Sequence, residues 1–179
     1  MNLLTDAVTG HFRRHDIPFV ERPGTGIVVA PVPVHGGSYT CVFQIDERNG
    51  LVVIYSICPC RAADDRRAAV EDALTRANFG LPFGNFEMDM GDGSIRFKTV
   101  ILSEERSVPG DGLVMHALDL NLRTHERYLP ALQDVVYRDL APAEAVERVE
   151  NGLSGDVDRI VARLLETCDY ADWEDPAEG

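Results

Sequence analysis

The sequence predicts an α+β protein in which an antiparallel, five-stranded sheet is packed by helices. Residues 38–46 alternate apolar and polar side chains, and residues 85–90 do the same, as half-buried strands do. Between them, residues 62–79 repeat apolar side chains at three and four, as an amphipathic helix does. The predicted order is helix, three strands, helix, two strands and further helices. With 179 residues and 45% hydrophobic side chains, we expect a single core.

The first elements are a short helix and a proline-bearing extended segment. Thr5 is a suitable cap for the helix, and Pro18 should end it. Residues 27–34 are apolar and β-branched, but Pro31 and Pro33 remove backbone donors from the ladder. We therefore expect an edge strand or an extended loop there.

A hairpin is predicted from residues 38–46 to residues 51–57, with Asn49-Gly50 as the turn signal. The returning strand is apolar on both faces at its start and should be central in the sheet. A two-residue turn places Cys41 opposite Cys58, whereas a three-residue loop through Arg48 breaks that pairing. The sequence leaves both registers open.

The helix of residues 62–79 should end in the left-handed region at Asn78 or Gly80. A second hairpin follows it, with Asp92-Gly93 as a type I′ turn. The register of a two-residue turn aligns the apolar side chains of the two strands and forms two charge pairs, whereas a three-residue loop does not. That register predicts the pairs Met90–Ile95, Asp89–Arg96, Met88–Phe97 and Glu87–Lys98.

The remainder of the chain is predicted to be helical. After the break at residues 109–112, a helical stripe runs from Leu113 to Val136, with a kink or restart at Pro130. Pro142 fits the first turn of another helix. Residues 1–168 should form one domain, in which a last helix at about 154–167 is an extension. Residues 169–179 should form an acidic, disordered tail.

Charge and hydropathy argue against two classes of partner. The chain has 30 acidic and 17 basic side chains, a net charge of −13, and no basic stripe for a phosphate backbone. No apolar run approaches the ~18 residues that a membrane span requires, and residues 1–15 lack the pattern of a secretory signal. We therefore expect a cytoplasmic protein that binds neither nucleic acid nor membrane.

The cysteines are the first candidates for chemistry. Cys58-Pro59-Cys60, together with Cys41, could hold a metal or act in redox chemistry. Structural zinc, however, usually has four ligands and two residues between paired cysteines, and no nearby histidine completes this set. Reduced thiols in a cytoplasm behave as small apolar groups, so packing is the favoured interpretation.

Other candidate sites are weaker. His11 and His15 lie four apart on the first helix, where Arg13 and Arg14 would repel a cation, and we expect a solvated face there. His116 and His125 are nine apart and have no nucleophile at a meaningful spacing. The acidic residues Glu87, Asp89 and Asp92 lack the spacing of a calcium-binding loop. The glycines of 24–26 and 36–37 lack the spacing of a phosphate-binding loop. No catalytic, cofactor-binding or metal-binding residue is therefore assigned.

Residues 76–99, RANFGLPFGNFEMDMGDGSIRFKT, resemble the YbjN family of bacterial sensory-transduction regulators. The likeness continues through residues 121–132, NLRTHERYLPAL, and includes Ser56-Ile57-Cys58-Pro59; it covers about residues 3–150. The resemblance implies a fold like the type III secretion chaperones, often dimeric, and no catalytic residues. Asn78, Phe79, Gly84, Asn85 and Phe86 match the motif, and from the residues themselves we interpret them as helix end, turn and core.

These observations predict a non-enzymatic, chaperone-like or regulatory protein that binds another polypeptide and forms a homodimer. The alternative is a thiol-based metal-binding or redox protein that uses Cys41, Cys58 and Cys60.

Overall fold

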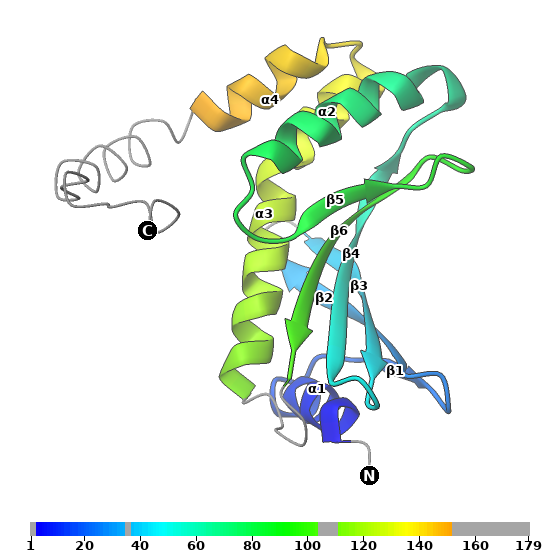
Figure 1. The fold of residues 1–179 in the computed structure, drawn as a ribbon, viewed down its shortest axis with the longest axis vertical. Helices are drawn as coiled ribbons and strands as arrows, with labels where there is room; N and C mark the ends of the chain where they lie inside the picture. Colours follow the sequence, from blue (N-terminus) through cyan, green and yellow to red (C-terminus); the bar gives the residue numbers. More distant parts are fainter. Residues whose placement is uncertain (1–2, 35–36, 104–110, 152–179) are drawn as a thin grey trace, which may run out of the picture.

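The computed structural model describes residues 3–34, 37–103 and 111–151. Its six strands form one antiparallel sheet in the order β1-β2-β3-β4-β6-β5 (Figure 1). The strands are β1 Val20–Arg22, β2 Ile27–Val34, β3 Gly37–Asp46, β4 Leu51–Arg61, β5 Asn85–Met88 and β6 Ser94–Leu102. The helices are α1 Leu3–Arg14, α2 Arg67–Phe79, α3 Asp111–Tyr137 and α4 Pro142–Asn151, and a short 3-10 turn, Asp64–Arg66, precedes α2. The α+β class is confirmed.

The sheet has six strands rather than the predicted five because β1 was not recognised. Its three residues are all exposed and show no alternation, so they carry no periodic signal. β1 pairs only with Ile27–Val29 of β2. Pro31 and Pro33 lie beyond that pairing, where β2 has a neighbour only in β3. The predicted edge strand is thus an edge only in its second half.

All four helices lie on one face of the sheet, which we call the covered face. α3 runs along β4 and β6, α1 packs against β3, and α2 and α4 pack together near β5 at the other end (Figure 1). The alternation predicted for residues 38–46 is confirmed, because Tyr39, Cys41, Phe43 and Ile45 are all buried beneath the helices. The core has two clusters, one around α1, β2 and β3, and one around α2, α4 and β5.

The N-terminus of α1 differs from the prediction. The helix begins at Leu3, so Thr5 lies inside it rather than capping it. Glu47, from the β3–β4 loop, accepts the backbone N–H groups of Leu4 and Thr5 at 3.1 and 2.8 Å. A carboxylate at a helix N-terminus satisfies free donors and complements the helix dipole. The cap is therefore supplied from a distant part of the chain.

The first hairpin has neither of the two predicted loops. Asp46 pairs with Leu51, which leaves a four-residue loop, and Cys41 lies opposite Ser56 rather than Cys58. The Asp46 carboxylate accepts the backbone N–H groups of Arg48 and Asn49, both at 3.0 Å. These side-chain bonds stabilise a longer turn than Asn49-Gly50 alone would make.

The second hairpin is shifted by two residues from the predicted register. Met88 pairs with Ile95, Glu87 with Arg96 and Phe86 with Phe97. Within the loop, Asp89 Oδ1 accepts the Gly91 N–H at 2.7 Å and Asp92 Oδ1 accepts the Ser94 N–H at 2.8 Å. A shift of two keeps each side chain on its predicted face. Met90, however, moves out of the strand and is 52% exposed.

The helical predictions are largely correct. Val70, Ala73, Leu74 and Ala77 form the buried stripe of α2, but the helix ends at Gly80 with a φ of −93°, not in the left-handed region. α3 is continuous through Pro130, so no restart occurs there, and α4 begins at Pro142 as predicted. The predicted helix at 154–167 and the tail at 169–179 lie outside the described residues.

Candidate functional site

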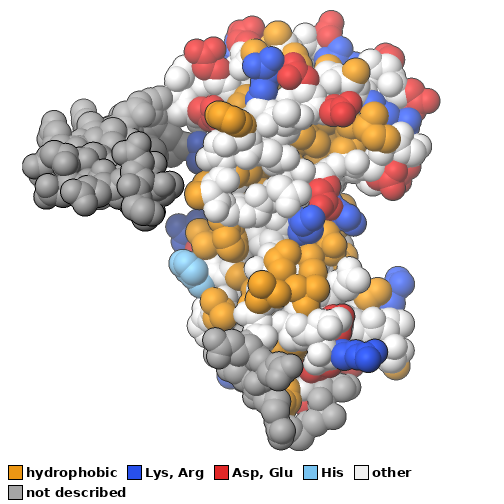
Figure 2. Space-filling view, in the orientation of Figure 1, with side chains coloured by type: hydrophobic (Ala, Val, Ile, Leu, Met, Phe, Trp, Pro, Cys, Tyr) orange, Lys and Arg blue, Asp and Glu red, His pale blue; other side chains and the backbone are white. Residues whose placement is uncertain are grey.

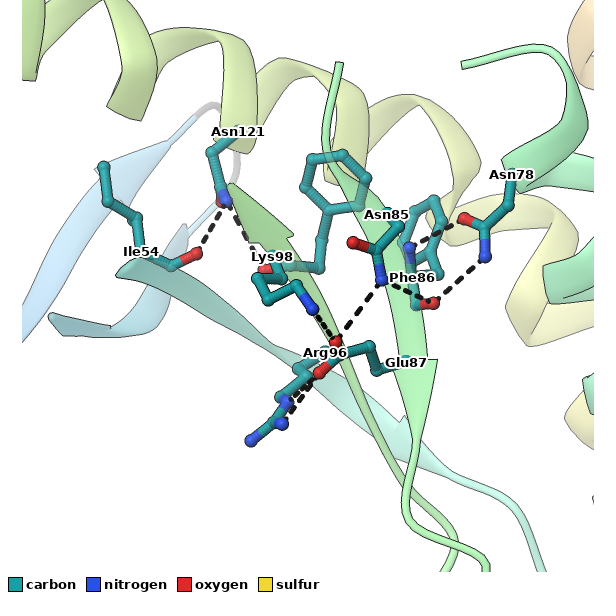
Figure 3. A network of polar contacts seen from close by, with 9 residues as sticks. Ile54, Asn78, Asn85, Phe86, Glu87, Arg96, Lys98 and Asn121 are labelled. Carbon is teal, nitrogen blue, oxygen red and sulfur yellow. Dashed lines mark hydrogen bonds and ion pairs between the residues drawn. The ribbon is translucent and has the colours of Figure 1, made fainter. Parts of the chain in front are cut away.

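The segment that resembles the YbjN family forms a junction between α2 and β5. The Phe86 N–H donates to Asn78 Oδ1 at 2.7 Å, and Asn78 Nδ2 donates to the Phe86 carbonyl at 3.1 Å (Figure 3). Phe86 is 3% exposed and stacks on Phe97 with ring centroids 4.7 Å apart. Gly84 has a φ of +71°, and a Cβ there would lie 2.6 Å from the Lys98 carbonyl oxygen. These residues hold the fold together, with one exception: Phe79, which is 95% exposed.

The face of the sheet opposite the helices is uncovered by any described element, and we call it the open face. Its side chains alternate with the buried ones along each strand. Val100 and Leu102 are 42% and 76% exposed, whereas Thr99 and Ile101 on the covered face are buried. Figure 2 shows hydrophobic side chains gathered over the middle of the sheet, next to a small group of charged ones. The apolar residues of the open face are Val20, Ile27, Val29, Pro31, Pro33, Val42, Leu51, Val53, Tyr55, Ile57, Val100 and Leu102.

The charges on the open face pair with one another. Glu87 Oε2 accepts from Arg96 Nε at 2.8 Å, and Glu87 Oε1 accepts from Lys98 (Figure 3). The Arg96 guanidinium also lies 4.2 Å from the centroid of the Tyr55 ring. Partial burial alone would raise the pKa of Glu87, but the hydrogen bonds from Lys98, Arg96 and Asn85 outweigh it, and the pKa is lowered. Glu87, Arg96 and Lys98 therefore border the apolar area on one side, and the Glu87 carboxylate is paired.

Beneath the covered face lies a buried polar cluster that the sequence did not reveal. Ser56 Oγ and His125 Nδ1 are 2.8 Å apart, and both residues are fully buried. Asn121, one helical turn before His125, donates to the Ile54 carbonyl at 3.3 Å (Figure 3). It also donates to Thr99 Oγ1 at 3.3 Å. Burial lowers the pKa of His125 to about 4, so the ring is neutral at pH 7. The only signal in the sequence was the spacing of Asn121 and His125 on one face of α3.

A serine beside a neutral histidine has the composition of a nucleophile and its base. Here both groups are enclosed, with an exposed fraction of 0% for each side chain. The Tyr39 ring lies 4.5 Å from the His125 ring and covers it. A substrate could not reach Ser56 without displacing the core, so the pair is structural in this arrangement.

The three described cysteines all point into the covered face. Cys41 is fully buried and lies opposite Ser56. Cys58 and Cys60 are 7% and 3% exposed, and their sulfur atoms are 3.1 Å apart. Within residues 3–34, 37–103 and 111–151, no three His, Cys, Asp or Glu side chains converge as a metal site requires, so the metal alternative gains no support.

The other candidates are placed as follows. His11 is fully buried rather than solvated, whereas His15 is exposed, and their ring centroids lie 4.3 Å apart. Asp89 and Asp92 accept backbone hydrogen bonds in the β5–β6 turn, and Gly24 and Gly26 form the β1–β2 turn with positive φ.

A depression of about 510 Å³ runs along β5 and β6. It is lined by Glu87, Met88, Asp89, Ser94 and Arg96, which include no nucleophile–base pair. Among the described helices, none has the length and apolar character to span a membrane.

The fold and these sites define a class: an α+β protein with one face of its sheet covered by helices and the other face open and apolar. Residues 5–134 match the sequence model of the YbjN family, described as "Putative bacterial sensory transduction regulator". The match covers more than half of the chain, and the chain therefore belongs to the YbjN family. It ends within α3, so α4 lies beyond the matched part. No curated protein matches the chain.

Proposed function

We propose that this protein is a non-enzymatic, cytoplasmic regulator that acts by binding protein, and that its open face binds a second copy of the chain. The family description supports a regulatory role. The observation that carries the binding surface is the exposure of Val100 and Leu102 on an apolar sheet face, along the half of β6 that β5 does not pair with. Contiguous apolar surface of this kind marks interaction sites in soluble proteins.

The size of the open face suits a pair of identical chains. Six strands spaced by roughly 4.8 Å span about 24 Å, and eight residues of β2 at roughly 3.4 Å each span about 27 Å. The resulting area of about 650 Å² is close to the ~800 Å² that each partner buries in a standard interface. Two such faces could stack as the sheets of a β-sandwich do.

Charge also favours this face for self-association. The whole chain carries a net charge of −13, so two copies repel each other over most of their surfaces. On the paired strands of the open face, however, Arg22, Arg96 and Lys98 outnumber Asp46 and Glu87. The ion pairs of Glu87 also mean that stacking would not bury an unpaired carboxylate there.

The test is sedimentation velocity of the full chain from about 1 to about 100 µM, the range in which a moderate dimer dissociates. The wild type should shift from monomer to dimer as its concentration rises. Val100→Glu should weaken the dimer by at least about tenfold, because it places a carboxylate among the apolar side chains of the open face. Leu113→Glu is the matched control, since Leu113 on α3 is 49% exposed against 42% for Val100.

Three results would contradict the proposal. A wild type that stays monomeric over the whole range excludes the second copy as the occupant of the open face. Equal dimerisation of Val100→Glu and the wild type would place the interface elsewhere. A heterologous protein that the wild type binds and Val100→Glu does not would assign the face to a different partner.

A further inference from the structure

We propose that Cys58 and Cys60 form a redox-active dithiol that closes to a disulfide when a peroxide oxidises it. The inference goes beyond the proposed function, because it concerns a covalent change under the covered face rather than binding on the open face. It rests on the approach of the two sulfur atoms to 3.1 Å and on an irregularity of β4 at these residues. The distance between the sulfur atoms and the irregular pairing of β4 are independent observations.

The backbone spacing is compatible with a bond. Two residues along a strand advance by roughly 6.6–6.8 Å, which lies at the upper end of the Cα separations found in disulfides. Any local shortening of the strand brings the pair further into that range. Because the sulfur atoms already lie together, closing the bond requires only a small rearrangement of the two side chains.

β4 is irregular where the cysteines lie. Its pairing with β6 runs to Ile57–Arg96 and resumes only at Arg61–Ser94, and its pairing with β3 ends at Ser56. Three residues of β4, Cys58 to Cys60, therefore stand against Ile95 alone on β6. A bulge leaves residues outside the ladder and bends the strand. The segment can thus adjust without breaking regular pairs on both sides.

The two thiols differ in character. The hydrogen bond between them lowers the pKa of Cys60 and raises that of Cys58, and burial further raises the pKa of Cys58. A lowered pKa favours the thiolate, so the proposed reaction takes Cys60 as the nucleophile and Cys58 as the resolving thiol. Burial raises the pKa of Cys41 to about 12. Cys41 therefore serves as an unreactive reference in the same core.

The proposed reaction has two steps. The Cys60 thiolate attacks one oxygen of hydrogen peroxide, the O–O bond breaks, and hydroxide leaves, so that Cys60 becomes a sulfenic acid. The Cys58 sulfur then attacks the Cys60 sulfur; the S–S bond forms, the S–O bond breaks, and the oxygen leaves as water with the Cys58 proton. Overall, two thiols and one peroxide give one disulfide and two waters, with two electrons passing to the peroxide. A low-molecular-weight thiol reduces the disulfide again by exchange.

The experiment uses the full chain with Cys168→Ser, which removes the one cysteine outside the described residues. The folded protein is treated with increasing concentrations of hydrogen peroxide and its free thiols are blocked. The masses of its tryptic peptides are then measured by mass spectrometry. Cleavage after Arg48 and Arg61 gives a peptide of residues 49–61 that contains Cys58, Cys60 and no other cysteine. We expect this peptide to lose two hydrogen atoms and to regain them with dithiothreitol.

Matched serine variants separate the roles. Cys58→Ser should leave a sulfenic acid on Cys60 that dimedone traps, Cys60→Ser should abolish the reaction, and Cys41→Ser should leave the mass loss unchanged. An unmodified 49–61 peptide in oxidised native protein would overturn the proposal, as would a bond from Cys41 or a bond formed only in urea. Because the first readout uses native thiols at all three positions, misfolding of a variant does not affect it.

Discussion

The two faces of the sheet are built from the same strands, yet they carry different kinds of side chain. On the covered face, Phe43, Ile54 and Phe97 are fully buried. Successive residues of a strand alternate between the two faces. On the open face, Val100 and Leu102 of β6 remain 42% and 76% exposed. The covered face holds the buried core, whereas the open face leaves apolar side chains exposed. The effect of a substitution in a strand should therefore depend on which face its side chain occupies.

The largest difference is expected for aromatic residues on the two faces. Phe97→Ala removes a fully buried ring and should lower the free energy of unfolding by about 3–5 kcal/mol. Tyr55→Ala on the open face loses mainly its contact with Arg96 and should cost about 1 kcal/mol. Urea denaturation at one low protein concentration measures both. Equal losses would show that the open face is packed as tightly as the covered one.

The next effect is a pH dependence that belongs to the covered face. Burial lowers the pKa of His125 from 6.5 to about 4. As the pH falls below 6.5, the unfolded chain binds a proton that the folded chain excludes, so stability is lost between pH 6.5 and about 4, by up to about 3 kcal/mol. His125→Gln should flatten that part of the stability curve. An unchanged slope would mean that other groups titrate there.

A smaller effect should follow from separating α2 from the sheet. Asn78→Ala removes both hydrogen bonds to the Phe86 backbone and leaves partly buried groups unsatisfied, a loss of about 1–3 kcal/mol. Asn85→Ala is the control on the open face, where the contacts of the Asn85 amide are 3.3 and 3.4 Å long. Its loss should be below about 0.5 kcal/mol by thermal denaturation. The prediction fails when the two variants unfold at the same temperature.

The smallest effect is expected for the charges of the open face. Glu87→Gln weakens two half-buried ion pairs near the surface and should cost below about 1 kcal/mol at pH 7. Because the folded pKa of Glu87 is lowered, its contribution is present above the unfolded value near 4.3 and is lost as the pH falls below it. Wild type and Glu87→Gln should therefore converge in stability below about pH 4. A difference that persists at pH 3 would assign the effect to packing.

These two faces could be predicted from the sequence because alternation is a local signal. Spacing alone predicts the buried residues of β3 and the buried stripe of α2. The hairpin loops were wrong for one shared reason. A type I′ turn needs positive φ at both central residues. Asn49 and Asp92 do not have it, because aspartate side chains close loops of four and six residues between the last paired residues instead.

The polar interior could not be predicted, because it depends on contacts between distant residues. Ser56 and His125 are 69 positions apart. Neither residue type nor spacing indicates that β4 and α3 bring them together. The proximity of Cys58 and Cys60 likewise depends on the bulge in β4, which follows from pairing with β6 and not from the cysteines themselves.

The two ends of the sheet constrain how this protein can associate. β2 presents Pro31 and Pro33 where β1 no longer shields it, and the opposite margin, β5, is only four residues long. The proline-bearing margin lacks the row of free amide donors that an incoming strand would need. Growth of the sheet by strand addition is thereby disfavoured at that margin. At the other margin, beyond the end of β5, no described strand pairs with residues 99–102 of β6 on the side away from β4, so strand addition is confined to that short stretch.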